Sequence, residues 1–128
     1  MSLSEHELIT QTIMKYVNAV VVGTHQDAVD AWHIKGKRIT YDENEEKVIF
    51  QPSPANSMFS SYKPNPEVKQ DAKIVLIEIT RSIASVKLRW NVRFGSLQKI
   101  CTDYLLLLKS KEGWKIVGKV SDIENVDT

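Results

Sequence analysis

Few side chains in this sequence have both the type and the setting for acid–base chemistry. Asp103 is the most notable, because it falls inside an otherwise apolar segment that runs to Leu108. A carboxyl group buried there could act as a general acid or base. The alternative is structural: if residues 95–97 form a hairpin loop, Arg89 lies opposite Asp103, and opposite charges stabilise an antiparallel pair. We favour the cross-strand pair and keep Asp103 as a catalytic candidate.

His33 and Asp42 are the other catalytic candidates. His33 follows Trp32 at the end of a predicted helix, where its imidazole could transfer protons near neutral pH or cap the last carbonyl groups of the helix. Asp42 follows a short predicted strand, and the hydroxyl of Tyr41 or Tyr104 could act together with these candidates. No cluster with metal-ligand spacing, glycine-rich phosphate loop or nucleophile motif is present. We therefore expect no metal and no cofactor.

Large aromatic rings are typical walls of small-molecule pockets. Seven are candidates for ligand binding: Tyr16, Trp32, Tyr41, Phe59, Tyr62, Trp90 and Tyr104. For each of these rings taken singly, we favour a place in the hydrophobic core. They predict a pocket for a small apolar or aromatic molecule only if the fold brings several of them together.

Two helices are predicted in the first quarter of the chain. Residues 4–7 form a capping box, and the apolar residues from Leu8 to Val21 recur at helical spacing, with Gly23 as the stop. A second capping box at residues 24–27 opens a shorter helix that ends near Trp32.

Strands are predicted for most of the remainder, over residues 39–41, 47–51, 72–80, 85–94, 98–109 and 114–120. Residues 52–66 contain all four prolines and predict a surface loop with a short helix, which could close over a pocket. The segment 104–108 is apolar on both faces, which is typical of a strand buried on both sides. We expect helices on one face and a second subunit on the other, forming a homodimer. The alternative is that a local loop covers Leu105 and Leu107.

Composition narrows the class of protein. The chain has 128 residues, the size of one domain (1–128), and 42% of them are hydrophobic. Its 17 basic and 16 acidic residues nearly balance, which argues against a nucleic-acid partner. The lone cysteine favours a reducing, cytoplasmic location, and no apolar run is long enough to span a membrane. The first residues lack the pattern of a signal peptide.

The last third of the chain carries a family resemblance. Thr102 to Lys109 and Trp114 to Lys119 follow the pattern T-D-Y-L-x-L-L-K, a tight turn, and W-K-I-V-x-K. In this the chain resembles the putative lumazine-binding family of the nuclear transport factor 2-like superfamily. The resemblance implies an α+β fold, in which N-terminal helices pack on a curved antiparallel sheet to form a cone with a cavity. It also implies dimerisation through the sheet.

The resemblance implies little about activity, because the superfamily includes isomerases, dehydratases, cyclases and non-catalytic adaptors. Three functions stay open. The first is binding of a small molecule in the cone, and the second is acid–base catalysis as an isomerase, dehydratase or cyclase. Catalysis would require at least two of the candidate groups to converge on one point. The third is a protein-interaction module with an incidental cavity.

Overall fold

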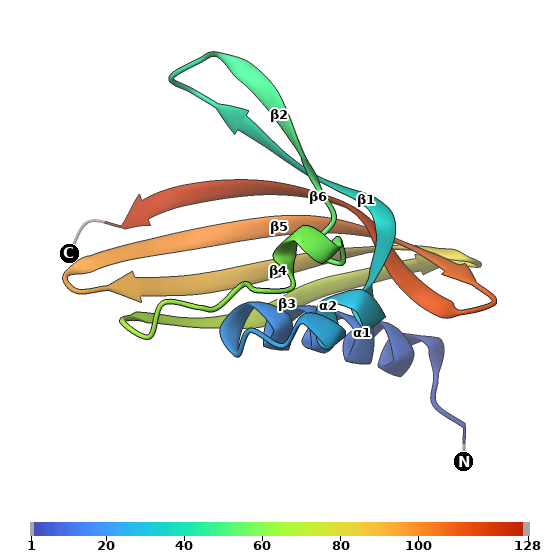
Figure 1. The fold of residues 1–128 in the computed structure, drawn as a ribbon. Coiled ribbons are helices and arrows are strands. Elements are labelled where there is room, and N and C mark those ends of the chain that lie inside the picture. The colour runs from blue at the N-terminus through green and yellow to red at the C-terminus, as the bar shows by residue number, and fades with distance from the viewer. Residues whose placement is uncertain (1, 127–128) are drawn as a thin grey trace.

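The computed structural model describes residues 2–126, which form two helices, a short 3-10 helix and six strands (Figure 1). The helices are α1 (Glu5–Val21), α2 (His25–Ala31) and the 3-10 turn η1 (Ser57–Phe59). The strands are β1 (Trp32–Asp42), β2 (Lys47–Pro52), β3 (Val68–Thr80), β4 (Ile83–Phe94), β5 (Leu97–Ser110) and β6 (Gly113–Val126).

The first helix begins at the predicted capping box. The Ser4 hydroxyl accepts a hydrogen bond from the Glu7 amide at 3.1 Å, and the Glu7 carboxylate accepts one from the Ser4 amide at 3.3 Å. The second capping box is not formed, because the Thr24 side chain makes no capping hydrogen bond. The second helix also ends one residue early, so that Trp32 already lies in strand β1.

The six strands form one curved, open sheet in the order β2-β1-β6-β5-β4-β3. The α+β fold with helices on a curved sheet is confirmed, with one difference: β1 and β6 run parallel, so the sheet is mixed. Both helices lie on one face of the sheet, and the β1–β2 hairpin projects away from it (Figure 1). The helices therefore leave the other face of the sheet uncovered.

Period-two alternation divides the sheet into an inner and an outer face. On β5, Leu105 and Leu107 point inward and are almost fully buried in the core that also contains Ile9 and Ile13 of α1. Leu106, between them, points outward and is 56% exposed. The leucine strand is thus covered on its inner face by the main core rather than by a local loop.

The register between β4 and β5 differs from the predicted one. The hairpin loop has two residues, so Phe94 pairs with Leu97. As a result Arg89 pairs with Thr102, and Asp103 pairs with Leu88. The predicted Arg89–Asp103 ion pair is wrong, because one residue fewer in the loop moves Asp103 to the inner face.

Candidate functional site

A cavity of about 290 Å³ lies between the helices, the 52–66 loop and the inner face of the sheet. Its lining is mostly apolar and aromatic, with a few polar groups. It consists of Tyr16, Ala19, Val20, Gly23, His25, Ala28, Arg38, Pro54, Phe59, Tyr62 and Lys119. An apolar wall with a small number of placed polar groups is the usual composition of a small-molecule site.

The 52–66 loop forms one wall of the cavity and is attached to the helices. The Tyr62 hydroxyl donates a hydrogen bond to the Val20 carbonyl at 2.9 Å. His25 Nε2 lies 3.2 Å from the Asn56 carbonyl oxygen. These contacts link the loop to the ends of α1 and α2, so the loop and helices together set the shape of the cavity.

Two cationic side chains reach the cavity from neighbouring strands. Lys119 Nζ donates to the Tyr16 hydroxyl at 2.8 Å and lies 4.0 Å from the Asp103 carboxylate. Burial alone would lower the Lys119 pKa, but Tyr16 and Asp103 outweigh it and raise that pKa above its ordinary value. Arg38 donates from Nε to the Pro52 carbonyl at 3.1 Å, and burial lowers its pKa.

Asp103 lies behind the cavity wall and is 1% exposed. Its carboxylate accepts hydrogen bonds from Trp90 Nε1 at 2.9 Å and from the Ser121 hydroxyl at 2.6 Å. Cys101 Sγ lies 3.6 Å from the same carboxylate. Burial, with the Asp103 charge beside it, raises the pKa of the Cys101 thiol to about 11. With two donors and a nearby ammonium, Asp103 organises the interior of the sheet and does not line the cavity.

The seven predicted aromatic residues separate into three groups. Tyr16, Phe59 and Tyr62 line the cavity. Trp32 and Trp90 are buried in the core and pack edge-on against Tyr16, at centroid distances of 5.7 and 6.2 Å.

Tyr41 and Tyr104 are 58% and 56% exposed and do not line the cavity. Tyr104 points outward because its neighbour Asp103 points inward on the same strand. Tyr41 lies in the part of β1 that pairs with β2, toward the hairpin turn. For these two residues the predicted place in the pocket is corrected.

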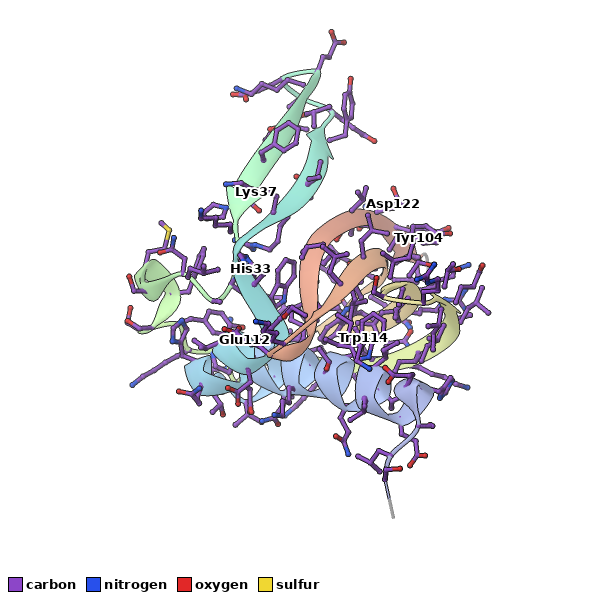
Figure 2. The ribbon with its side chains drawn as sticks, turned by 90° about the vertical axis from the view of Figure 1, so that its right-hand side faces the viewer. His33, Lys37, Tyr104, Glu112, Trp114 and Asp122 are labelled. Carbon is purple, nitrogen blue, oxygen red and sulfur yellow. The ribbon has the colours of Figure 1, made fainter. Side chains whose placement is uncertain are left out.

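The candidate acid–base groups do not converge. His33 is exposed, and its Nδ1 accepts a hydrogen bond from the Lys35 amide at 3.0 Å. Asp42 accepts two hydrogen bonds from the backbone of the β1–β2 turn, at 2.9 and 3.1 Å. Figure 2 shows His33 on β1, well apart from Tyr104 on β5. The predicted catalytic constellation is therefore not assembled at one point.

The three basic residues of the cavity are not among the ligand-binding residues that the sequence predicts: Arg38, Lys119 and His25. His25 lies at the start of α2 and is half-buried against the loop. Lys119 is the last residue of the W-K-I-V-x-K motif, and this motif is the one sequence feature that could have pointed to it. The predicted strand begins at residue 39 and leaves out Arg38, whereas β1 begins at Trp32 and contains it.

The described residues offer neither a metal site nor a membrane-spanning helix. Residues 2–126 contain no group of three or more His, Cys, Asp or Glu side chains placed to hold a metal ion. Neither does this part of the chain contain a helix with the length and apolar character needed to cross a membrane. Trp32 Nε1 is the one buried side-chain polar atom in the described structure without a hydrogen-bond partner.

Solved structures with the same architecture are diverse. An NTF2-like protein of unknown function from Methylobacillus flagellatus is 24% identical, with a TM-score of 0.71 over 97% of this chain and 95% of its own. A CaMKII hub from S. rosetta is 13% identical, with a TM-score of 0.75 over 97% and 100%. A protein described as a putative ketosteroid isomerase from Shewanella frigidimarina is 18% identical, with a TM-score of 0.68 over 93% and 98%.

At these identities the likeness concerns the fold alone. Among curated proteins none matches the sequence. The family model described as "Putative lumazine-binding" matches residues 4–121, almost the whole chain and not only its last third. The mixed, helix-covered sheet is the NTF2-like fold of these structures, and the family match shows that the chain belongs to the putative lumazine-binding family.

Proposed function

We propose that this protein is a dimeric small-molecule-binding protein whose cavity takes a small, mostly apolar or aromatic compound. The observation that carries the proposal is the cavity of about 290 Å³ with Tyr16, Phe59 and Tyr62 in its wall. Its volume lies near the lower end of the range for ligand pockets, which suits a compound of one or two rings. Acid–base catalysis has less support, because His33 and Asp42 are engaged with the backbone outside the cavity.

Binding can be tested with a panel of one- and two-ring compounds and thermal unfolding as the readout. A ligand that binds only the folded protein raises the unfolding midpoint, and the rise grows with the logarithm of the ratio of ligand concentration to Kd. Val20→Phe would fill part of the cavity, because Val20 lines it. Val21→Phe is the matched control, since Val21 is the next residue of α1 and is exposed. We expect ligand shifts for the wild type and Val21→Phe that are lost in Val20→Phe. Equal shifts in all three proteins would contradict binding in this cavity.

The dimer is proposed to form through the outer face of the sheet. One row of residues, paired strand to strand, crosses all six strands on this face, and five of its six members are apolar. The row is Phe50, Ile39, Val120, Tyr104, Lys87 and Leu76. Leu106 and Leu108 extend the apolar surface beside it and are 56% and 47% exposed. A contiguous apolar surface of this kind is typical of a protein–protein contact.

We propose a second copy of this chain as the partner on this face. The apolar pattern of the strand predicts a cover there, and the family resemblance implies dimerisation through the same sheet. Its test is sedimentation equilibrium of the wild type and of Tyr104→Glu with Leu106→Lys. We expect a wild-type dimer and a monomeric double variant. Met14→Lys, on an exposed position of α1, should leave the dimer intact. A wild-type monomer throughout the concentration range, or an unaffected double variant, would contradict this interface.

The β1–β2 hairpin adds exposed apolar side chains beside the outer face of the sheet. Tyr41, Val48 and Phe50 are each more than half exposed on it. Ile39 pairs with both Phe50 and Val120, so the hairpin surface continues the outer face of the sheet. We therefore assign the hairpin to the same proposed dimer contact. Phe50→Ser should weaken the dimer, and an unchanged dimerisation constant would separate the hairpin from it.

A further inference from the structure

The cavity has an uneven distribution of charge. Arg38 and Lys119 are paired neighbours on the parallel strands β1 and β6, and both side chains line the cavity. The lining contains no Asp or Glu. Asp103 is the one carboxylate near Lys119, and it lies behind the wall at 4.0 Å. One buried negative charge therefore stands against two positive charges.

The protein does not use all the hydrogen-bonding capacity of these cations. Arg38 donates from Nε to Pro52, and its guanidinium lies 4.9 Å from the centre of the Phe59 ring. Within the described part of the chain, its two terminal nitrogens donate no hydrogen bond. Arg38 is thus held by its Nε and its stacked face, while the edge that can bind a carboxylate in bidentate fashion is free.

Lys119 is held beside Arg38 in a similar way. Its ammonium has three donors, of which one is used by the Tyr16 hydroxyl at 2.8 Å. The Asp103 oxygen at 4.0 Å is beyond normal hydrogen-bond length, and both Asp103 oxygens already accept from Trp90 and Ser121. Tyr16 and Asp103 together stabilise the Lys119 charge. The surplus positive charge therefore lies on Arg38, which has no carboxylate partner among the described residues, and partial burial makes such a charge costly unless a partner is supplied.

We infer that the ligand is an organic monoanion: a carboxylic acid with an apolar body of one or two rings. This inference rests on the proposed binding function and names its ligand class. The carboxylate would lie against Arg38 and Lys119, and the ring would lie against Val20, Phe59 and Tyr62. A single negative charge matches the surplus of one positive charge. A phosphate dianion would exceed it in a cavity with few other donors.

Matched acids and amides test this inference. The probes are 2-naphthoate with 2-naphthamide and indole-3-acetate with indole-3-acetamide, titrated into the wild-type protein by isothermal calorimetry. Each acid differs from its amide in charge but hardly in shape. We expect the acids to bind at least about tenfold more tightly than the amides, as a charge-assisted bidentate contact allows. The affinity for the acids should also fall as salt is raised.

Variants locate the effect. Arg38→Met should weaken binding of the acids by about tenfold or more and leave the amides nearly unchanged. Lys37→Met is the matched control, because Lys37 is the preceding residue of β1 (Figure 2), is exposed, and is absent from the cavity lining. Arg38→Lys keeps the charge without the bidentate edge and should give an intermediate affinity. Thermal unfolding without ligand shows whether each variant is folded. If Arg38→Met is unfolded, the comparison of Arg38→Lys with the wild type tests the inference.

The outcomes separate the two proposals. Acids and amides that bind equally, with no effect of Arg38→Met, would overturn the anion inference and leave the proposed binding function standing. Failure of every acid and every amide to bind would overturn both. Preferential binding of the acids that is equally lost in Lys37→Met would place the anion outside the cavity and also overturn the inference.

Discussion

Removal of the Asp103 carboxylate is expected to destabilise the protein more than a typical surface substitution. The carboxylate is 1% exposed and accepts from Trp90 at 2.9 Å and from Ser121 at 2.6 Å. Hydrogen bonds to a charged group contribute about 1.5–3 kcal/mol each. Asp103→Ala removes both and leaves the buried Trp90 N–H without an acceptor. It also leaves Lys119 without its one nearby carboxylate.

The expected loss for Asp103→Ala is about 3–5 kcal/mol, the range found when one partner of a buried charge pair is removed. Asp103→Asn should cost less, about 1–2 kcal/mol, because its amide oxygen can still accept from Trp90 and its amide nitrogen can donate to the Ser121 oxygen. A domain of this size has a total free energy of unfolding of about 5–15 kcal/mol, so the alanine variant should be near the limit of stable folding.

Urea unfolding at pH 7, followed by tryptophan fluorescence, measures both losses. All proteins should be compared at one concentration, because dimerisation makes apparent stability depend on concentration. Asp71→Ala, at an exposed position of β3, is the control and should change the free energy by less than about 0.5 kcal/mol. A loss below about 1 kcal/mol for Asp103→Ala would refute the view that this carboxylate organises the interior of the sheet. Equal losses for Asn and Ala would assign the effect to charge and not to the two hydrogen bonds.

Three further predictions follow from individual contacts. Gly23 has φ of 87°, and a Cβ there would lie 2.7 Å from Pro64 Cδ, so Gly23→Ala should cost about 1–3 kcal/mol. Gly118→Ala, with open space around its Cβ, should be nearly neutral in the same urea titration. Because the Cys101 pKa is raised from 9.0 to about 11, iodoacetamide at pH 8 should alkylate the folded protein about a hundredfold more slowly than the urea-unfolded chain. Equal alkylation rates would contradict the burial of that thiol. Lys109 and Trp114 lower the Glu5 pKa below its ordinary value of 4.5. The contribution of Glu5 to the free energy of unfolding is therefore fully present above pH 4.5, and it is lost as pH falls through the lower pKa of the folded protein. Glu5→Gln should therefore flatten the dependence of the unfolding midpoint on pH in that acidic window, and an unchanged slope would contradict the contact.

The parts of the fold that the sequence predicts well are those governed by local physics. The Ser4–Glu7 capping box and the helical spacing after it predict α1, because both signals arise within one or two turns. Alternation in residues 85–94 predicts the inner and outer faces of β4, where Val86, Leu88 and Trp90 are buried. The motif of the last third predicts the family, and the model match confirms it over residues 4–121.

The full length of β1 could not be predicted from the sequence. For that reason Arg38, which β1 places in the cavity wall, was not predicted as a site residue. Residues 35–38 are mostly basic, and the pairing of β1 with β6 shifts between Trp32 and Lys37. Gly36 packs against the Trp32 ring in that stretch, at a distance where a Cβ would lie 3.0 Å from it. The irregularity removes the period-two signal, so Arg38 could not be assigned to the inner face.

The position of Asp103 depended on a single residue in a loop. Both a two-residue and a three-residue loop are compatible with Gly95-Ser96-Leu97. The three-residue loop would pair Asp103 with Arg89 on the outer face, whereas the two-residue loop pairs it with Leu88 on the inner face. Packing decides between them, because the shorter loop brings Leu105 and Leu107 to the core face. The cavity depends on still more distant contacts, since α1, the 52–66 loop, β1 and β6 meet only in the folded chain.

The most direct test of the account is a crystal structure of the protein with the tightest-binding compound of the ligand panel. We predict density for the compound between Tyr16, Phe59 and Tyr62, in the cavity under the 52–66 loop. A cavity that stays empty while the compound binds elsewhere, or one filled by protein side chains, would contradict the central claim that this cavity is the binding site.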